Sequence, residues 1–263
     1  MTVVADDITK IYRLDGRTVL VTGASSGLGR HFATTLARAG ATVIVAARRT
    51  GALAQLVAEI EALGRSALAV PLDVCDLQSV TACFDAIARH YGGPDVVVCN
   101  AGISITKPLL KHTEEDWDAV INTNLSGSWR VAQEAARRMV AADKGGSIIM
   151  IASILSERVA RGVAPYVISK AGLVQLTKSL ALELARYKIR ANAIQPGYII
   201  TDLNREFLES EAGEELRERI PTRSFGRPED LDGALLLLAS DASAHMTGAT
   251  IAVDGGHLVN SHS

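Results

Sequence analysis

Short apolar runs alternate with longer stretches rich in Ala, Leu, Glu and Arg along nearly the whole chain. Two of these runs, 96–98 and 148–151, are apolar at every position, which is typical of strands covered on both faces of a parallel sheet. The pattern predicts strands at residues 18–21, 42–46, 67–72, 95–99, 147–151, 190–194 and 250–253. It predicts helices at residues 29–39, 53–63, 77–90, 114–142 and 165–187.

This alternation of strands and helices indicates one α/β domain over residues 1–263. Strand–helix–strand units with right-handed crossovers build a doubly wound Rossmann fold, here a seven-stranded parallel sheet flanked by helices. No Pro/Ser-rich linker, repeat or low-complexity tract divides the chain. Residues 1–14 are expected to form an N-terminal extension.

The segment 202–222 departs from this alternation. It holds seven acidic residues and three arginines and lacks a strong apolar stripe. Because ligands of open α/β sheets bind beyond the carboxyl ends of the strands, a segment that follows such an end is placed to act as a substrate lid. The alternative is a solvated helical hairpin that does not move.

Composition and charge exclude several classes of function. The chain is 48% hydrophobic and 21% charged, as in ordinary globular proteins. Its net charge of -2 gives no electrostatic reason to expect nucleic acid or an anionic membrane as a partner. The N-terminus lacks the apolar core of a secretory signal, and no run approaches the ~20 apolar residues that span a bilayer. The three cysteines lack Cys-x-x-Cys spacing, which favours a cytoplasmic location, and the six histidines lack ligand spacing, so no metal is expected.

The first predicted strand leads into the first predicted helix through a glycine cluster, Thr22-Gly23-Ala24-Ser25-Ser26-Gly27-Leu28-Gly29. Such a context is typical of a turn that binds the pyrophosphate of a dinucleotide. Gly23 permits the tight turn, Gly27 lets the backbone approach the phosphates, and Gly29 permits close packing of helix on strand. The helix N-terminus then offers N–H donors and a positive dipole to the phosphates.

Further motifs follow this cluster in order along the chain: Asn100-Ala101-Gly102, Tyr166-x-x-x-Lys170 and Pro196-Gly197. Together with the glycine cluster, they resemble the short-chain dehydrogenase/reductase superfamily from about Leu14 to Gly256. The resemblance implies that Asp73 and Val74 lie by the adenine, that Asn100 and Gly102 line the floor of the cofactor site, and that Ile199 and Thr201 contact the nicotinamide carboxamide. Cys99 departs from the family, which often has Asn there, and we expect it to pack in the core.

The end of the second predicted strand indicates which cofactor is preferred. An acidic residue there would hydrogen-bond the 2′-hydroxyl of NAD, but the chain has Arg48 and Arg49. A guanidinium pairs well with a phosphate, so NADP(H) is expected to be preferred, with Arg48 ahead of Arg49 on the 2′-phosphate, and NAD(H) remains possible. The residues expected to bind the cofactor are Gly23, Ser25, Ser26, Gly27, Leu28, Gly29, Arg48, Asp73, Val74, Asn100, Ala101, Gly102, Tyr166, Lys170, Pro196, Gly197, Ile199 and Thr201.

Tyr166 and Lys170 share one face of a predicted helix, because residues four apart are neighbours. A lysine charge ~6 Å away would lower the pKa of the phenol from ~10 towards ~8, which suits a group that exchanges a proton with a substrate oxygen. Ser153, at the end of a predicted strand, would hold that oxygen, and Lys170 would also bond the nicotinamide ribose. Asn124 matches the family's helix asparagine that anchors a water relay to the lysine, while Ser169 is expected only to pack. The four expected catalytic residues are Ser153, Tyr166, Lys170 and Asn124.

The substrate is predicted only as a class, a small-molecule carbonyl or alcohol. Residues 12–17 and 151–157 resemble the gluconate 5-dehydrogenase-like branch, which acts on keto-sugar acids, while 3-oxoacyl thioester reductases share most of the same residues. A sugar-acid carboxylate needs a cation, for which Arg158, Arg161 and Lys107 are candidates. The alternative from another class is a regulatory nucleotide-binding protein without turnover, but such a protein needs no proton donor.

Relatives in this superfamily are usually dimers or tetramers that pair two long helices and the last strand. The resemblance therefore implies a homotetramer or homodimer. A mass near that of the 27.8 kDa chain in equilibrium sedimentation would contradict this prediction.

Overall fold

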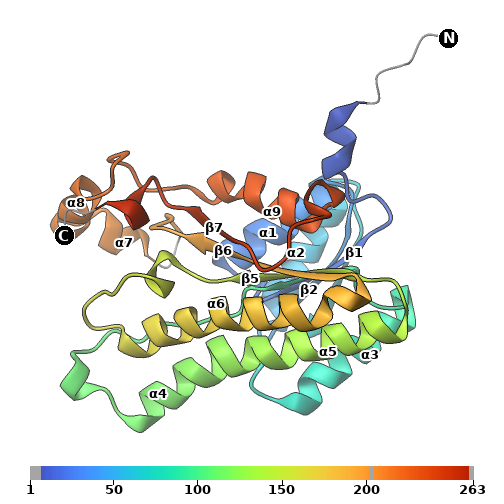
Figure 1. The fold of residues 1–263 in the computed structure, drawn as a ribbon, viewed down its shortest axis with the longest axis horizontal. Coiled ribbons are helices and arrows are strands. Elements are labelled where there is room, and N and C mark those ends of the chain that lie inside the picture. The colour runs from blue at the N-terminus through green and yellow to red at the C-terminus, as the bar shows by residue number, and fades with distance from the viewer. Residues whose placement is uncertain (1–6, 202–203, 261–263) are drawn as a thin grey trace.

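A seven-stranded parallel sheet forms the centre of the structure, a computed structural model that describes residues 7–201 and 204–260 (Figure 1). The order across the sheet is β3-β2-β1-β4-β5-β6-β7, and every neighbouring pair is parallel. The strands are β1 Thr18–Thr22, β2 Thr42–Ala47, β3 Ala67–Pro71, β4 Val96–Cys99, β5 Gly146–Ile151, β6 Ile189–Pro196 and β7 Thr250–Val253. This confirms the predicted fold class and all seven predicted strands.

Helices cover both faces of the sheet, as the continuous apolar runs required (Figure 1). In β5, Ile148 and Met150 join one buried apolar cluster, and Ile149 and Ile151 join the other, because successive side chains point to opposite faces. On the first face lie α3 Leu77–Tyr91, α5 Gly127–Ala141 and α6 Ala164–Leu184. On the second face lie α1 Gly27–Arg38, α2 Thr50–Ala62 and α9 Asp232–Ala239. Cys99 is buried in the first cluster, which confirms its predicted packing role.

The long helix predicted for residues 114–142 is present but not regular. α4 Glu114–Ile121 and α5 are joined by a π-helical turn over Asn122–Ser126, so the two run on as one long rod beside α6 (Figure 1). A π turn inserts extra backbone into the ladder and is frequent at functional sites. Apolar periodicity gave no sign of it, because the flanking turns keep their buried stripe.

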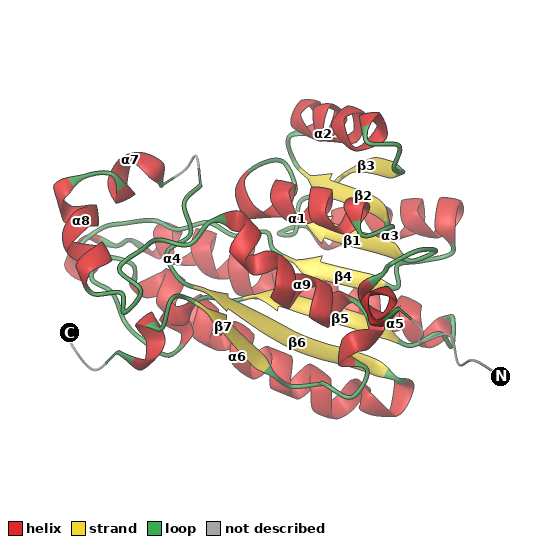
Figure 2. Cartoon of the chain, turned by 90° about the horizontal axis from the view of Figure 1, so that it is seen from above, coloured by secondary structure: helices red, strands yellow, loops and turns green. Residues whose placement is uncertain are grey.

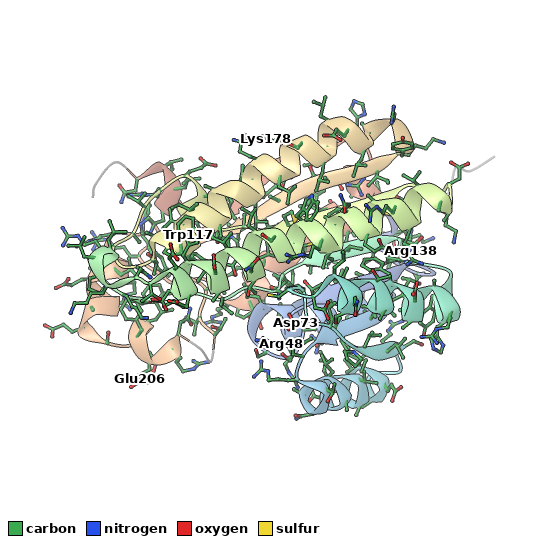
Figure 3. The ribbon with its side chains drawn as sticks, turned by 90° about the horizontal axis from the view of Figure 1, so that it is seen from below. Arg48, Asp73, Trp117, Arg138, Lys178 and Glu206 are labelled. Atoms are coloured by element: carbon green, nitrogen blue, oxygen red, sulfur yellow. The ribbon has the colours of Figure 1, made fainter. Side chains whose placement is uncertain are left out.

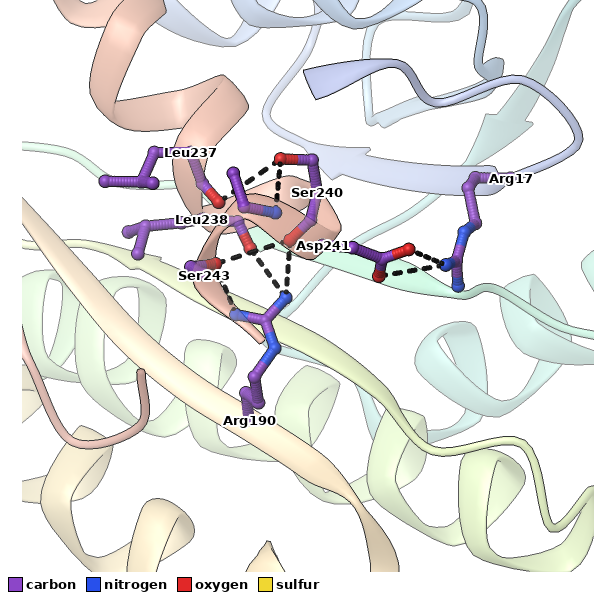
Figure 4. A network of polar contacts seen from close by, with 8 residues as sticks. Arg17, Arg190, Leu237, Leu238, Ser240, Asp241 and Ser243 are labelled. Carbon is purple, nitrogen blue, oxygen red and sulfur yellow. Dashed lines mark hydrogen bonds and ion pairs between the residues drawn. The ribbon is translucent and has the colours of Figure 1, made fainter. Parts of the chain in front are cut away.

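Helix α9 was not predicted, since its run of four leucines has no amphipathic pattern that separates helix from strand. Arg190 of β6 fixes the end of this helix (Figure 4). Its guanidinium donates to the carbonyls of Leu238 (3.2 Å) and Ser240 (3.1 Å) and to the Ser243 hydroxyl (2.7 Å). A cation that satisfies the last carbonyls of a helix stabilises its C-terminus. The anchored helix in turn covers the second face near β5 and β6.

The strand order reverses between β1 and β4, and at such a point open α/β sheets bind ligands beyond the carboxyl edge of the sheet. α7 Arg205–Leu208 and α8 Glu211–Glu218 lie beyond that same edge (Figure 2). They make up most of the predicted lid 202–222, of which Asp202 and Leu203 lie outside the described residues. Residues 1–6 of the predicted N-terminal extension also lie outside them. The lid function stays a prediction.

Candidate active site

The glycine turn between β1 and α1 has the geometry that its sequence predicts. A Cβ on Gly23 would lie 2.8 Å from the Ala101 Cα, and one on Gly29 would lie 2.4 Å from the Gly23 carbonyl oxygen, so both positions are closed to larger residues. Gly27 differs: its φ is +53°, and a Cβ there would meet no atom within 4 Å. The turn therefore presents bare backbone toward open space, which fits the close approach of a pyrophosphate.

The N-terminus of α1 has no side-chain cap. Ser26 is the N-cap residue, yet its hydroxyl makes no hydrogen bond to the helix. Instead the Arg49 guanidinium donates to the hydroxyls of Ser25 (2.9 Å) and Ser26 (2.6 Å). The first N–H groups of a 12-residue helix are thus left to a ligand, and a cation lies at the same place. Leu28, in the first turn of α1, is partly buried.

The two arginines at the end of β2 have different surroundings. Sequence analysis put Arg48 ahead of Arg49, but Arg49 is the one that reaches the glycine turn. Arg48 is exposed and directly follows β2, and Asp73, two residues beyond the end of β3, lies near it (Figure 3). Both cations therefore lie at the carboxyl edge of the sheet, close to the glycine turn.

Two further loops lie at the same carboxyl edge of the sheet. The Thr22 hydroxyl accepts hydrogen bonds from the backbone N–H groups of Asn100 (3.0 Å) and Ala101 (3.1 Å), and the Asn100 amide donates to the Thr22 carbonyl (2.9 Å). Asn100 thus ties the loop after β4 to the glycine turn. Asp73 accepts from the Cys75 N–H (2.9 Å), and Val74 is buried.

The loop after β6 supplies the last of the predicted cofactor residues. Pro196 ends the strand, and a Cβ on Gly197 would lie 2.7 Å from the Asp254 Cα. Ile199 is buried, whereas the Thr201 hydroxyl donates to the side-chain oxygen of Asn204 (3.0 Å). In this structure that hydroxyl therefore holds the start of the lid segment.

Ser153, Tyr166 and Lys170 meet at the carboxyl end of β5. Ser153 lies two residues beyond the end of the strand and is buried, while Tyr166 and Lys170 lie one turn apart on α6. The Lys170 Nζ lies 5.4 Å from the centroid of the Tyr166 ring and donates to the Ile151 carbonyl (2.7 Å). The predicted triad is thus brought together in space.

Burial dominates the ionisation of this triad. It raises the pKa of Tyr166, although a hydrogen bond with Ser153 acts in the opposite direction. It also lowers the pKa of Lys170 to about 8. From the sequence, the lysine charge is expected to lower the pKa of the phenol. In the protein alone that pKa is raised instead, because burial removes water from the phenolate.

Asn124 is fully buried in the π turn, and its side chain joins the loop at Ile103 to Ser169 of α6, an arrangement called the Asn124 clamp below. Its Oδ1 accepts from the Ile103 N–H (2.8 Å), and its Nδ2 donates to the Ile103 carbonyl (2.9 Å) and to the Ser169 hydroxyl (3.0 Å). Ser169 in turn donates to the Tyr166 carbonyl (2.7 Å). Sequence analysis treated Ser169 as packing only and so missed this link, for which the sole signal was a hydroxyl beside Lys170.

Comparisons with known proteins agree with this geometry. The profile of a family described as enoyl-(acyl carrier protein) reductase matches residues 23–257. The chain belongs to the short-chain dehydrogenase/reductase superfamily. The relatives that this chain matches are named dehydrogenases and reductases, so the chain is an oxidoreductase.

Three relatives illustrate the breadth of the superfamily around this chain. The 3-oxoacyl-(acyl-carrier-protein) reductase FabG of Thermotoga maritima is 39% identical over 94% of this chain and 100% of its own. The L-rhamnose 1-dehydrogenase (NAD(P)(+)) of Azotobacter vinelandii is 41% identical over 93% of this chain and 97% of its own. The crystal structure of a gluconate 5-dehydrogenase from Burkholderia cenocepacia, in complex with NADP and tartrate, has a TM-score of 0.92 and 37% identity, with 96% and 99% of the two chains covered.

Ser169→Ala tests the clamp. It leaves the buried Asn124 amide one acceptor short and removes the bond to the Tyr166 carbonyl, so the free energy of unfolding should fall by about 1–3 kcal/mol. Urea unfolding at a fixed protein concentration measures this, with Ser179→Ala, an exposed serine on the same helix, as the control. Equal stability of the two variants would show that the clamp contributes nothing.

Proposed function

We propose that the chain is an NADP(H)-dependent dehydrogenase/reductase that interconverts a ketone and a secondary alcohol, with a keto-sugar acid as the substrate. The observation that carries the proposal is the meeting of Ser153, Tyr166 and Lys170 beside the glycine turn, at the carboxyl edge of the sheet. A regulatory binding protein would need the turn but not a partly buried phenol beside a buried ammonium.

Each residue of the site has a proposed chemical role. NADPH, when bound, supplies the hydride that reduces the carbonyl carbon. The Ser153 hydroxyl holds the carbonyl oxygen, and the Tyr166 phenol gives its proton to that oxygen as the alkoxide forms. The Lys170 ammonium stabilises the phenolate that remains, and Asn124 fixes the loop at Ile103 against α6. In the reverse direction, the phenolate takes the alcohol proton.

A preference for NADP(H) over NAD(H) is supported by charge. Arg48 and Arg49 follow β2, and neither pairs with a carboxylate of the described residues. A 2′-phosphate at that place gains two guanidinium partners, whereas a ribose hydroxyl gains much less. The gluconate 5-dehydrogenase of similar structure was solved with NADP.

The substrate proposal is supported by two similarities. The Burkholderia relative is a gluconate 5-dehydrogenase, and the 2-dehydro-3-deoxy-D-gluconate 5-dehydrogenase of Escherichia coli is 35% identical over 95% of this chain. A second candidate substrate is a 3-oxoacyl thioester, which the similarity to the Thermotoga 3-oxoacyl-(acyl-carrier-protein) reductase supports. Initial rates of NADPH consumption with a panel that contains keto-sugar acids and 3-oxoacyl thioesters distinguish the two candidates.

Assembly and location are also proposals. Large apolar side chains are exposed along the rod of α4 and α5 and on α6, among them Trp117, Trp129 and Leu182. Their exposure supports a homodimer or homotetramer, in which contact between copies would bury them. Within the described residues, no helix is long and apolar enough to cross a membrane. A cytoplasmic location stays a prediction.

Tyr166→Phe tests the proton donor. Without the hydroxyl no group delivers a proton to the alkoxide, so kcat with NADPH and the best ketone of the panel should fall about 100-fold or more. The control is Tyr187→Phe, which removes a surface phenol beyond the end of α6. Unchanged turnover in Tyr166→Phe would remove the residue from the mechanism.

Arg48→Ala tests cofactor choice. The loss of a charged hydrogen bond to phosphate, worth about 1.5–3 kcal/mol, should raise the KM for NADPH about 10-fold or more and leave the KM for NADH nearly unchanged. Initial rates with both cofactors measure the difference, with Arg38→Ala, an exposed arginine at the other end of α1, as the control. If only Arg49→Ala shows the effect, the phosphate partner is Arg49.

The lowered pKa of Lys170 predicts a pH dependence. The lysine carries its charge below about pH 8 and loses it above, while the raised pKa of Tyr166 keeps the phenol protonated. The kcat/KM for NADPH in the reductive direction should therefore fall as pH rises through about 8. A profile that stays flat from pH 7 to 9.5 would contradict the charge assigned to Lys170.

A further inference from the structure

A second cluster of polar side chains lies beside Tyr166, on the side of β6 and β7. Tyr198 follows the end of β6, and its ring packs against that of His257 with a centroid distance of 5.6 Å. A charge on Tyr198 opposes ionisation of Tyr166, so the two phenols lie within electrostatic range. Tyr198 thus connects the proposed catalytic site to the turn that follows β7.

Arg158 is the fixed cation of this cluster. It lies in the loop after Ser153, and its Nη1 donates to the carbonyls of His257 and Asn260, the latter at 3.1 Å. Backbone carbonyls hold the guanidinium in place but leave its charge unpaired. No ion pair of Arg158 occurs among the described residues. Burial raises the pKa of Tyr198 and the Arg158 charge opposes that rise, whereas burial and the Arg158 charge together lower the pKa of His257.

His257 carries a polar atom that lacks a partner. The residue is 8% exposed, and its Nδ1 has no hydrogen-bond partner among the described residues. A buried polar nitrogen without a partner is costly, and a ligand group that bonded it would recover that cost. Burial lowers the pKa of His257, so the ring is neutral near pH 7 and one of its nitrogens can donate.

The three cations that the sequence suggests as partners of a substrate carboxylate differ in how available they are. Lys107 is paired with both oxygens of Asp116, at 2.7 and 2.6 Å. Arg161 is exposed and makes no hydrogen bond or ion pair with Tyr166 or Tyr198. Within the described part of the chain, only Arg158 of the three is both held by backbone carbonyls and without a carboxylate partner.

The acidic groups near the cluster are already engaged. The Asp254 carboxylate accepts from the N–H groups of Gly256 (2.9 Å) and Leu258 (2.5 Å). The Glu157 carboxylate accepts from the buried Gln195 amide (3.0 Å). Neither carboxylate pairs with Arg158, so the guanidinium keeps its capacity for an anion from outside the chain.

We propose that Arg158, with His257 and Tyr198, forms a subsite that binds the carboxylate of the substrate while its carbonyl lies at Ser153 and Tyr166. The inference deepens the proposed function and rests on it for the position of the carbonyl. It assigns selection of a hydroxy or keto acid, over a neutral ketone, to three residues outside the proposed catalytic set.

The test compares binding of D-gluconate with that of D-sorbitol, which has the same six-carbon chain without the carboxylate. Calorimetry with saturating NADPH, which cannot accept a hydride from an alcohol, gives both dissociation constants for the full chain without turnover. The unsubstituted protein should bind gluconate at least 10-fold more tightly than sorbitol. Arg158→Met should remove that difference without weakening sorbitol, and His257→Phe, which keeps a ring against Tyr198, should reduce it several-fold.

Two further variants complete the design. Arg137→Met, on the exposed side of α5, is the control and should leave both constants unchanged, whereas loss of gluconate binding in Arg161→Met alone would place the subsite elsewhere and overturn the proposal. The proposal would also be overturned if the unsubstituted protein bound the two compounds equally or bound neither. Equal weakening of both compounds in Arg158→Met would overturn it too, because it would show that the arginine only holds the loop. Because binding needs no turnover, these results are independent of the test on Tyr166.

Discussion

The buried ammonium of Lys170 is the constraint on which the site depends. It donates to the Ile151 carbonyl at the end of β5, and burial lowers its pKa to about 8. The nearby loop also approaches closely: a Cβ on Gly102 would be in van der Waals contact with the Nζ, at 3.7 Å, and in tight contact with the Asn124 Oδ1, at 3.3 Å. Strand, loop and helix thus converge on one cation that is poorly hydrated. Negative charge that develops beside it is stabilised more strongly there than it would be in water.

The π turn explains how one asparagine can hold three segments. In a regular helix, the residues at Asn122–Ser126 would continue the spiral of α4 into α5 with their side chains spread around it. The extra backbone re-aims Asn124, so its amide reaches Ile103 after β4 and Ser169 on α6. Ser169 carries the link on to the Tyr166 carbonyl. The position of the phenol is therefore coupled to the loop after β4 through a chain of buried and partly buried hydrogen bonds.

Most of the fold and the membership of the triad were predictable, because apolar runs and motif spacing are local properties of the sequence. What was missed depends on tertiary structure. The π turn over Asn122–Ser126 leaves no trace in periodicity, and the four leucines of α9 fit a strand as well as a helix. The contact of Arg49 with Ser25 depends on how β2 and the glycine turn meet in space. The sign of the pKa shift at Tyr166 depends on burial, which spacing alone does not give.

The raised pKa of Tyr166 bears on whether the site is prepared to reduce a ketone or to oxidise an alcohol. Burial and the nearby Tyr198 both keep the proton on Tyr166, and only the hydrogen bond with Ser153 acts against them. Lys170 is charged below about pH 8, so near neutrality the tyrosine and the lysine both hold their protons. This is the state that protonation of an alkoxide requires. Oxidation of an alcohol needs the phenolate, which the residues of the chain alone disfavour. The resting protonation of the site therefore matches the reductive half of the proposed reaction.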